Sequence, residues 1–473
     1  MTRHIITSIA LILVVQPACV GDSGTTDSGT PDSGGSDAPS SDVTNDTAPV
    51  CTDASDTTSD PNNCGSCGHA CKSGFSCSAS VCGNVVEQVA SGTLFSCARL
   101  HDGSVWCWGS TEQGELGFEP SGSDDTCGTQ RCKAAPQKIP GLTDVTQVVA
   151  GYSSACALDK LGAVKCWGQN EAGELAQPTS TGHLATPTGV TFPPNTPILD
   201  ITIGTNTVCA RSQNKDVYCW GSNKNDEVGV STPATVTTPT LVAGFNHDVK
   251  QLQISYDAGT GQHACVLRDD ASVWCWGYNA GGELGGSLGG GGTPTPRKVT
   301  GLTSPTSIAV GPGVSCAIDT NVLCWGTDVY GERGAPGAPD TPTPTQMVGL
   351  SGTISTLAIS GWAQFAITQT GSVFAWGAVT DGELGDGVYT GTTCGALQCA
   401  AAVETVGGLT NIVQISPSHV VALALTKDHT VLSWGANDFA QLGHLPKASG
   451  SGDGDCGGGG ICNPLPKPVT TLP

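Results

Sequence analysis

Short stretches of alternating apolar and polar residues recur through residues 84–473 and predict β-strands. Residues 145–151 read VTQVVAG, in which β-branched residues alternate with polar ones, as in a half-buried strand. Residues 156–168 read CALDKLGAVKCWG, two short alternating runs around a turn, which predicts a β-hairpin. A segment with proline follows, as at 136–139 and 297–300, and we expect an edge strand there because sheet edges tolerate proline. The pattern therefore predicts four strands per unit.

This unit occurs seven times. Each copy contains a Trp-Gly pair, 49 to 59 residues from the next, and a turn resembling Gly-Glu-Leu-Gly follows most of the pairs. One unit cannot bury both of its faces, but packing against two neighbours can. We therefore predict an all-β fold, a seven-bladed β-propeller. The tryptophans that mark the copies, which we expect to pack between blades, are Trp108, Trp167, Trp220, Trp276, Trp325, Trp376 and Trp434.

Cysteines fix the register of the hairpins. Four copies carry two cysteines with nine residues between them, and the fifth copy is two residues shorter, so both cysteines keep their faces. Copies six and seven lack both cysteines together, which indicates that each cysteine bonds its partner. Directly opposed strand positions are close enough for a disulfide. The expected hairpin disulfides are Cys97–Cys107, Cys156–Cys166, Cys209–Cys219, Cys265–Cys275 and Cys316–Cys324.

The longest connections are expected to be loops, at 118–135, 176–197, 285–296, 386–402 and 444–463. Three of them, in copies one, six and seven, contain a local cysteine pair. We expect disulfides in these loops at Cys127–Cys132, Cys394–Cys399 and Cys456–Cys462.

The composition supports many short strands joined by tight turns. Only 13% of residues are charged, and glycine and proline are abundant, at 66 and 29 of 473 residues. The net charge is −22, and residues 20–50 hold six aspartates and no lysine or arginine. Since an acidic surface repels phosphate backbones, we expect no nucleic-acid partner.

The N-terminus predicts export. Residues 1–19 read MTRHIITSIALILVVQPAC, a short basic start followed by an apolar run that is too short to span a bilayer. This resembles a bacterial lipoprotein signal, which implies a signal peptide at 1–18 and a lipid anchor on Cys19. Gln16 stands where such signals usually have leucine, so ordinary signal cleavage is the alternative. Val20 after the cysteine implies the outer membrane, with the domain at the cell surface or otherwise periplasmic or secreted.

Residues 19–50 are rich in Asp, Ser, Gly and Thr and predict a disordered tether. Residues 51–83 form a small module with six cysteines, in which three disulfides allow fifteen connectivities. A zinc site is the alternative, since Cys64, Cys67, Cys71 and Cys77 have suitable spacing and His69 could join them. An oxidising compartment favours disulfides, so we expect no metal. The module cysteines are Cys51, Cys64, Cys67, Cys71, Cys77 and Cys82.

The cysteine count supports the anchor. Three bridges in the module, five in the hairpins and three in the loops use all but one of the 23 cysteines. The remaining cysteine is Cys19.

The repeat pattern VxQVxxGxxxxCAL, then DGxVxCWGxNxxGELG, resembles the repeat of the regulator of chromosome condensation family over residues 84–473. The resemblance implies a seven-bladed propeller. Because strand one of the first copy (85–90) is present and PKPVTTLP ends the chain, we expect the last blade to supply its own outer strand. The family's founding member exchanges nucleotide on a small nuclear GTPase. That role is not carried over, because its exchange loops have no match here and an exported protein would not meet a cytosolic GTPase.

Candidate chemistry is sparse, and we expect neither catalytic residues nor a cofactor. Glutamates recur in the turns after the Trp-Gly pairs, as at Glu115 and Glu383, and recurrence in every blade indicates backbone hydrogen bonding, since an active site needs one specialised place. His263 is the best candidate for an axial role, and a hydrogen-bonded core histidine is the alternative. Trp362 replaces the usual small residues of its loop and is the single contact residue that we predict.

The sequence thus predicts a monomeric, non-enzymatic binding scaffold of the cell envelope. It would bind a protein partner through its loops and the membrane through its lipid anchor. A carbohydrate-binding envelope protein is one alternative. Guanine-nucleotide exchange, the activity of the family's founding member, is another. A hydrolase or lyase would need a carboxylate pair or a triad, and the sequence shows neither pattern.

Overall fold

The computed structural model describes residues 75–78, 81–256, 261–388, 391–394, 397–400, 402–456, 460–470 and 472. The predicted signal, the Cys19 anchor, the tether and most of the six-cysteine module lie outside these residues. Of that module, a two-stranded sheet is described, in which β1 (Phe75–Ser78) pairs with β2 (Val81–Asn84) and Cys77 lies opposite Cys82.

Seven antiparallel sheets follow, each built from one continuous segment of chain. Blade one contains β3 (Val86–Ser91), β4 (Phe95–Leu100), β5 (Val105–Ser110), β7 (Gln130–Lys138) and the short β6 (Asp125–Cys127). Blade two contains β8 (Val145–Ala150), β9 (Ser154–Asp159), β10 (Val164–Gln169) and β11 (His183–Gly189), with the 3-10 helix η1 (Thr179–Thr181) before β11. Blade three contains β12 (Ile198–Ile203), β13 (Thr207–Ser212), β14 (Val217–Ser222) and β15 (Thr235–Leu241).

The remaining four blades repeat this order. Blade four contains β16 (Val249–Ile254), β17 (His263–Arg268), β18 (Val273–Gly277) and β19 (Thr293–Lys298). Blade five contains β20 (Ser307–Gly311), β21 (Val314–Ile318), β22 (Val322–Gly326) and β23 (Thr341–Gln346). Blade six contains β24 (Ile354–Ser360), β25 (Ala363–Thr368), β26 (Val373–Gly377) and β29 (Glu404–Thr405), with a separate hairpin of β27 (Thr392–Cys394) and β28 (Leu397–Cys399). Blade seven contains β30 (Ile412–Pro417), β31 (Val421–Thr426), β32 (Val431–Ala436), β34 (Ile461–Pro468) and the short β33 (Gly454–Asp455).

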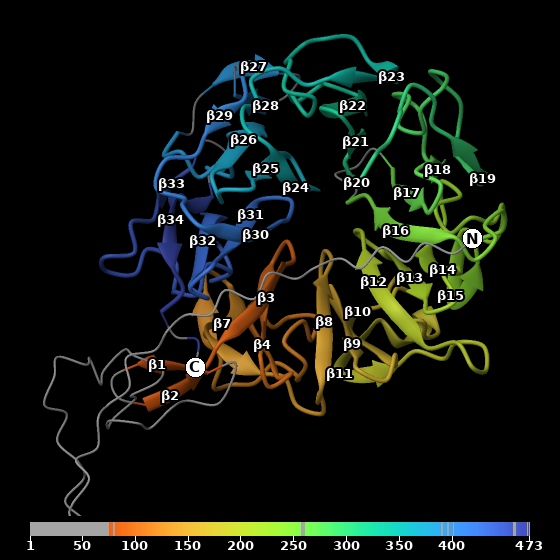
Figure 1. Cartoon of the computed structure of the whole chain (residues 1–473). Coiled ribbons are helices and arrows are strands. Elements are labelled where there is room, and N and C mark those ends of the chain that lie inside the picture. The colour runs from red at the N-terminus through yellow and green to blue at the C-terminus, as the bar shows by residue number, and fades with distance from the viewer. Residues whose placement is uncertain are drawn as a thin grey trace, which may run out of the picture. The chain divides into compact units, whose positions relative to one another are not determined.

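The seven-bladed all-β prediction is confirmed, and the ring closes as expected. Figure 1 shows the blades in succession round a ring, with blade seven beside blade one. Blade seven supplies its own outer strand β34, so the closure is made by side chains. Gln414 accepts a hydrogen bond from the Val89 amide at 3.0 Å and donates one to the Val89 carbonyl at 2.9 Å. Inner-strand glutamines at 88, 147 and 251 bind the next blade's backbone in the same way.

The hydrophobic core lies between blades, where one residue type recurs seven times. Each Trp of a Trp-Gly pair is fully buried and donates its indole N–H to a backbone carbonyl in the turn of the preceding blade, at 2.7–2.9 Å. Trp167 thus binds the carbonyl of Glu115, and Trp108 closes the ring on Gln441 of blade seven. The predicted interblade packing of these tryptophans is confirmed, and it includes a hydrogen bond that the sequence did not indicate.

The hairpin cysteines lie directly opposite each other, with Cα atoms 4.1 Å apart. The structure joins the five expected hairpin pairs: Cys97–Cys107, Cys156–Cys166, Cys209–Cys219, Cys265–Cys275 and Cys316–Cys324. It also joins the three loop pairs, Cys127–Cys132, Cys394–Cys399 and Cys456–Cys462. In blades six and seven, Phe365 lies opposite Ala375 and Leu423 opposite Ser433, in the same register.

That register gives a direct test. We expect the double substitution Leu423→Cys and Ser433→Cys to form a sixth hairpin disulfide on oxidative folding, because the two positions are opposed like the natural pairs. Intact mass spectrometry should show the loss of two hydrogen atoms and no free thiol. The single Leu423→Cys variant is the control and should react with iodoacetamide once unfolded. A free thiol pair in the folded double variant would contradict the shared register.

All five segments expected as loops contain strand residues, and in 285–296 these are the start of β19. The disulfide of blade one folds part of 118–135 into the β6–β7 hairpin, and those of blades six and seven do the same for β27–β28 and β33–β34. Residues 176–197 contain η1 and the whole of β11. These insertions are polar and short, so they lack the alternation by which strands are predicted from sequence.

Candidate interaction face

The two faces of the propeller carry different connections. In each blade the amide that ends the third strand binds a carbonyl in the connection between the first two strands, as Ser110 binds Leu94 and Ala378 binds Trp362. The connections after strands one and three therefore share one face, which we call the loop face. It carries four of the five segments that were expected as long loops and the first part of the fifth, 176–197, whose end lies in the β11–β12 connection on the other face.

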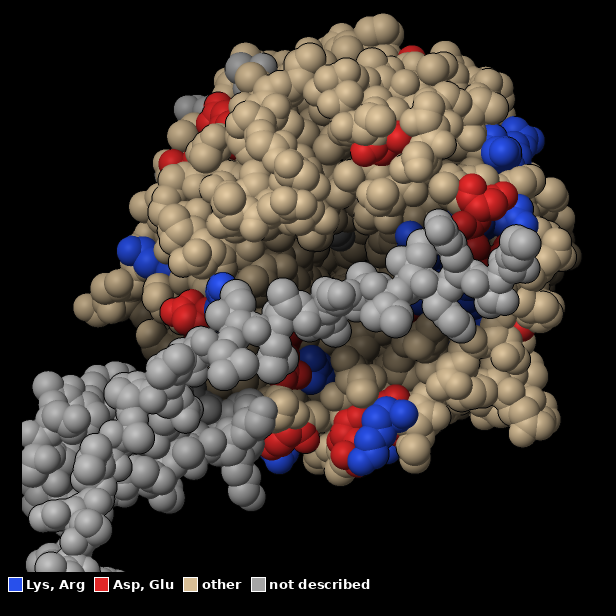
Figure 2. Space-filling view, viewed as in Figure 1, with Lys and Arg blue, Asp and Glu red and all other residues tan. Residues whose placement is uncertain are grey.

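The opposite face, the hairpin face, is made of short turns, and several of its charges form ion pairs. Short turns between strands two and three bind the inner strand of the next blade, as the Gly162 carbonyl binds the Ile198 amide. Ion pairs join Lys160 to Asp144 at 2.8 Å and Arg268 to Asp248. The hydrogen bond from Arg268 lowers the pKa of Asp248. In Figure 2, acidic and basic residues lie next to each other at several points round the ring.

Aromatic residues from several blades meet on the loop face. Tyr256 of blade four reaches Thr93 of blade one, and the two hydroxyls form a hydrogen bond across the ring. The Tyr256 ring lies 5.9 Å from the His419 ring of blade seven, and His419 lies 4.0 Å from Trp362 of blade six in an edge-to-face arrangement. Tyr330 of blade five contacts Trp362 at 5.9 Å. We call these five residues the axial cluster.

Trp362, the contact residue predicted from sequence, lies in this cluster. Its side chain is half-buried against His419, so it does not stand free on the surface as a lone contact. Its indole nitrogen is buried and has no hydrogen-bond acceptor among the described residues. The sequence signal that could have found the cluster is the second residue after the inner strand, which is Trp362 in blade six, Tyr256 in blade four and His419 in blade seven, but threonine in blades one and three.

The recurring turn glutamates are structural, as expected. Each buried carboxyl accepts a hydrogen bond from the amide two residues before it, for example Gln113 to Glu115 and Asp381 to Glu383, both at 2.8 Å. Burial raises the pKa of Glu383 to about 8 and that of Glu174 to about 7. One carboxyl oxygen of each has no partner among the described residues, which disfavours the ionised form. Burial also raises the pKa of the turn glutamates of blades one, three, four and five: Glu115, Glu227, Glu283 and Glu332.

His263 is a buried core residue, the alternative that the sequence left open. It is fully buried, and Ser315 Oγ lies 2.8 Å from its Nε2. Since the Ser315 hydroxyl donates to the Glu283 carbonyl, His263 must be the donor to Ser315. Burial lowers the pKa of His263 to about 3, so it is neutral. Within the described ranges no group of His, Cys, Asp and Glu is arranged to hold a metal ion.

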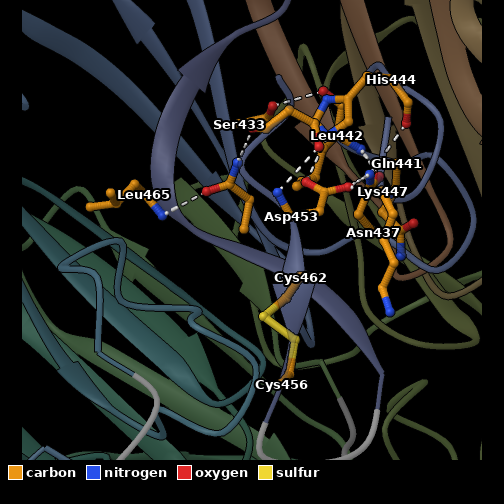
Figure 3. Close-up of polar contacts among 12 residues, drawn as sticks. Ser433, Asn437, Gln441, Leu442, His444, Lys447, Asp453, Cys456, Cys462 and Leu465 are labelled. Carbon is orange, nitrogen blue, oxygen red and sulfur yellow. Dashed lines mark hydrogen bonds and ion pairs between the residues drawn. A yellow bond between two sulfur atoms is a disulfide. The ribbon is translucent and has the colours of Figure 1, made fainter. Parts of the chain in front are cut away.

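The insertion of blade seven is held by one buried carboxylate (Figure 3). Asp453 accepts hydrogen bonds from His444 Nε2 at 2.8 Å, from the Asn437 side chain at 2.9 Å and from the Lys447 amide at 3.0 Å. Although burial opposes ionisation, these bonds keep the pKa of Asp453 below its usual value. The Cys456–Cys462 disulfide fixes the end of the same segment. The hydrogen bonds of Asp453 and the disulfide therefore hold this insertion in place.

The sequence of the repeat identifies its family. Models of the regulator of chromosome condensation (RCC1) repeat match residues 102–158 and, in a second form, residues 86–115, 145–174, 198–227 and 257–283. Residues 86–174, 198–227 and 257–283 of the chain therefore carry RCC1 repeats. The resemblance inferred from the motif is confirmed, and the RCC1 repeats coincide with blades one to four of the propeller.

Known RCC1 proteins are similar over most of the propeller. The ultraviolet-B receptor UVR8 of Arabidopsis thaliana is 24% identical over 362 residues, which cover 75% of this chain and 78% of the receptor. The human probable E3 ubiquitin-protein ligase HERC6 is 29% identical over 45% of this chain, but the match spans only 20% of the ligase. The structure of Prp20p from Saccharomyces cerevisiae, a protein that binds Gsp1p and histones, superposes with a TM-score of 0.63 at 20% identity, covering 78% of this chain and 86% of Prp20p.

No helix in the described ranges is long and apolar enough to cross a membrane.

Proposed function

We propose that this protein is a non-enzymatic scaffold that is held at the cell envelope by a lipid on Cys19 and binds a partner protein through its loop face. One observation carries the proposal: the connections that differ most between blades all lie on the face that holds the axial cluster. Aromatic side chains supply much of the binding energy at protein interfaces. The binding of Gsp1p and histones by Prp20p supports protein recognition by a propeller of this kind.

The envelope location rests on the N-terminal sequence. The apolar run and the Ala-Cys pair indicate a lipoprotein signal, and the eight disulfides of the propeller suit an oxidising compartment. Outside the cytosol, nucleotide exchange on a GTPase has no substrate. Labelling with radioactive palmitate, with Cys19→Ser as the control, tests the anchor.

Carbohydrate binding is the second candidate, and one observation favours it. The axial cluster brings an indole and an imidazole to one place, and aromatic rings are common platforms for sugars. A glycan array probed with the full chain and with Trp362→Ala separates the two functions. Glycan binding that is lost in Trp362→Ala would favour the second candidate over the first.

Photo-crosslinking tests the protein-binding proposal. We expect a photoreactive amino acid at Tyr152, which is 39% exposed on the loop face, to capture one protein from envelope and secreted fractions. The same amino acid at Leu161, 77% exposed on the hairpin face, should capture none, because the proposed partner binds the opposite face. Mass spectrometry identifies the product. Capture at Leu161 alone would place partner binding on the hairpin face and contradict the proposal.

A further inference from the structure

Three disulfide-stapled hairpins lie on adjacent blades of the loop face. They are β6–β7 in blade one, β27–β28 in blade six and β33–β34 in blade seven, and each contains one of the loop disulfides. Blade seven contacts both of the others, since β30 packs against β3 and β24. We call the described residues of 112–133, 381–400 and 438–462 the stapled surface. Blades two to five carry no disulfide in the corresponding connections.

The three insertions pack against their neighbours. The Cys127–Cys132 disulfide of blade one forms an apolar cluster with Ala440 of blade seven. A Cβ placed on Gly382 of blade six would lie 2.7 Å from Pro464 Cα of blade seven, so these segments are in close contact. The stapled surface is therefore continuous across the seam at which the ring closes. It is fixed before any partner arrives, which lowers the entropic cost of binding.

Acidic side chains predominate on this surface. Three of the aspartates accept hydrogen bonds from backbone amides: Asp125 from Ala134, Asp386 from Val388 and Asp438 from Ile461. None of the three forms an ion pair with a described residue. Burial raises the pKa of Asp381, and so does the like charge of Asp438 from the next blade. The lysine and arginine residues of the stapled surface are Arg131, Lys133 and Lys447, of which Lys133 pairs with Asp124 and Lys447 with Asp455.

We propose that the stapled surface docks a partner protein through a basic face of that partner. This inference rests on the proposed scaffold function and names the site and the chemistry of its partner. Lysine and arginine side chains would neutralise carboxylates that the chain itself leaves unpaired, and opposite fields accelerate association. The Trp362 carbonyl binds the Ala378 amide at the start of the blade-six insertion, so the axial cluster adjoins the docking surface.

A carbodiimide crosslinker tests the proposal, because it joins carboxylates to lysine amines without a spacer. The purified full-length chain is mixed with envelope and secreted fractions and crosslinked at two salt concentrations. We expect peptides that contain Asp125, Asp386 or Asp438 to be joined to lysines of a single protein. The yield should fall steeply as salt increases.

Matched charge variants complete the test. The triple variant Asp125→Asn, Asp386→Asn and Asp438→Asn should reduce capture at least tenfold, with an unchanged melting temperature. The control Asp102→Asn, Asp270→Asn and Asp428→Asn removes the same charge from the hairpin face and should capture as the parent does. Capture that survives the first variant, or that maps to another surface, overturns this inference and leaves the scaffold function standing. If the parent captures no protein, the scaffold function fails as well.

Discussion

The propeller should be more stable at pH 5 than at pH 8, with a melting temperature higher by about 5 °C or more at the lower pH. Six buried turn glutamates have raised pKa values, about 7 for Glu174, Glu283 and Glu332 and about 8 for Glu383. In the unfolded chain each would titrate near 4.5. Protonation is therefore favoured by folding, so the stability from these groups is complete below pH 4.5 and is lost as pH rises through 7 to 8.

Other carboxylates determine how far the pH can fall before the propeller loses stability. The pKa values of Asp248 and Asp453 are lowered from 3.8, so their contribution is present at higher pH and is lost as pH falls below that range. Carboxyls with lowered pKa values are ionised in both the folded and the unfolded chain between pH 5 and 8, so the change in stability over this interval comes from the six raised groups, at about 1.4 kcal/mol for each unit of pKa shift. Stability should thus be greatest near pH 5. A melting temperature that is flat from pH 5 to 8 would contradict the buried neutral acids.

Blade seven contains the natural control for this prediction. Gln441 takes the place of the turn glutamate, and its side-chain oxygen accepts the Phe439 amide at 2.8 Å, as the carboxyls do in other blades. We therefore expect Glu383→Gln to match the parent at pH 5 and to exceed it at pH 8. Gln441→Glu should do the reverse and steepen the pH dependence. Thermal melts of the three proteins at both pH values measure the difference.

The strands and hairpin disulfides were predictable because the signal repeats. Cysteines that are present or absent together specify the hairpin register in each copy, as Cys316–Cys324 shows with its shorter turn. The role of the turn glutamates followed from the same repetition. The indole hydrogen bond to the preceding blade did not, because a backbone carbonyl acceptor leaves no trace in the sequence.

The axial cluster was only partly predictable. Thr93, Tyr256 and His419 belong to blades one, four and seven, and only ring closure brings them together. Trp362 was singled out as an unusual residue in its loop, but its packing against His419 depends on a contact between blades. The stapled hairpins were expected as loops with disulfides, and their adjacency also follows from closure of the ring.

Replacing Arg333 with leucine should destabilise the propeller by about 3 kcal/mol at pH 8, because it removes the cation that pairs with the buried carboxylate of Asp328. Four blades have an asparagine at the position of Asp328, and its side-chain oxygen accepts the amide five residues later, as Asn279 does for Leu284 at 3.0 Å. Asp328 makes the same bond to the Arg333 amide at 2.7 Å. Its side chain is fully buried, and burial raises its pKa to about 6 although Arg333 opposes this.

Blade five thus differs from the repeat at two positions that compensate each other. Arg333 stands where five other turns have leucine and blade three has Val228. Its guanidinium donates to the carbonyls of Thr327 and Pro339. We expect Arg333→Leu to regain stability at pH 5, where Asp328 becomes protonated, and the double variant Asp328→Asn and Arg333→Leu to restore the pattern of blade four and most of the lost stability at pH 8. Urea unfolding of the parent, both single variants and the double variant gives the coupling energy. If the two residues share one buried charge, Asp328→Asn should recover stability that Arg333→Leu alone loses. If instead the stability losses of the two single variants sum to the loss of the double variant, the residues act independently.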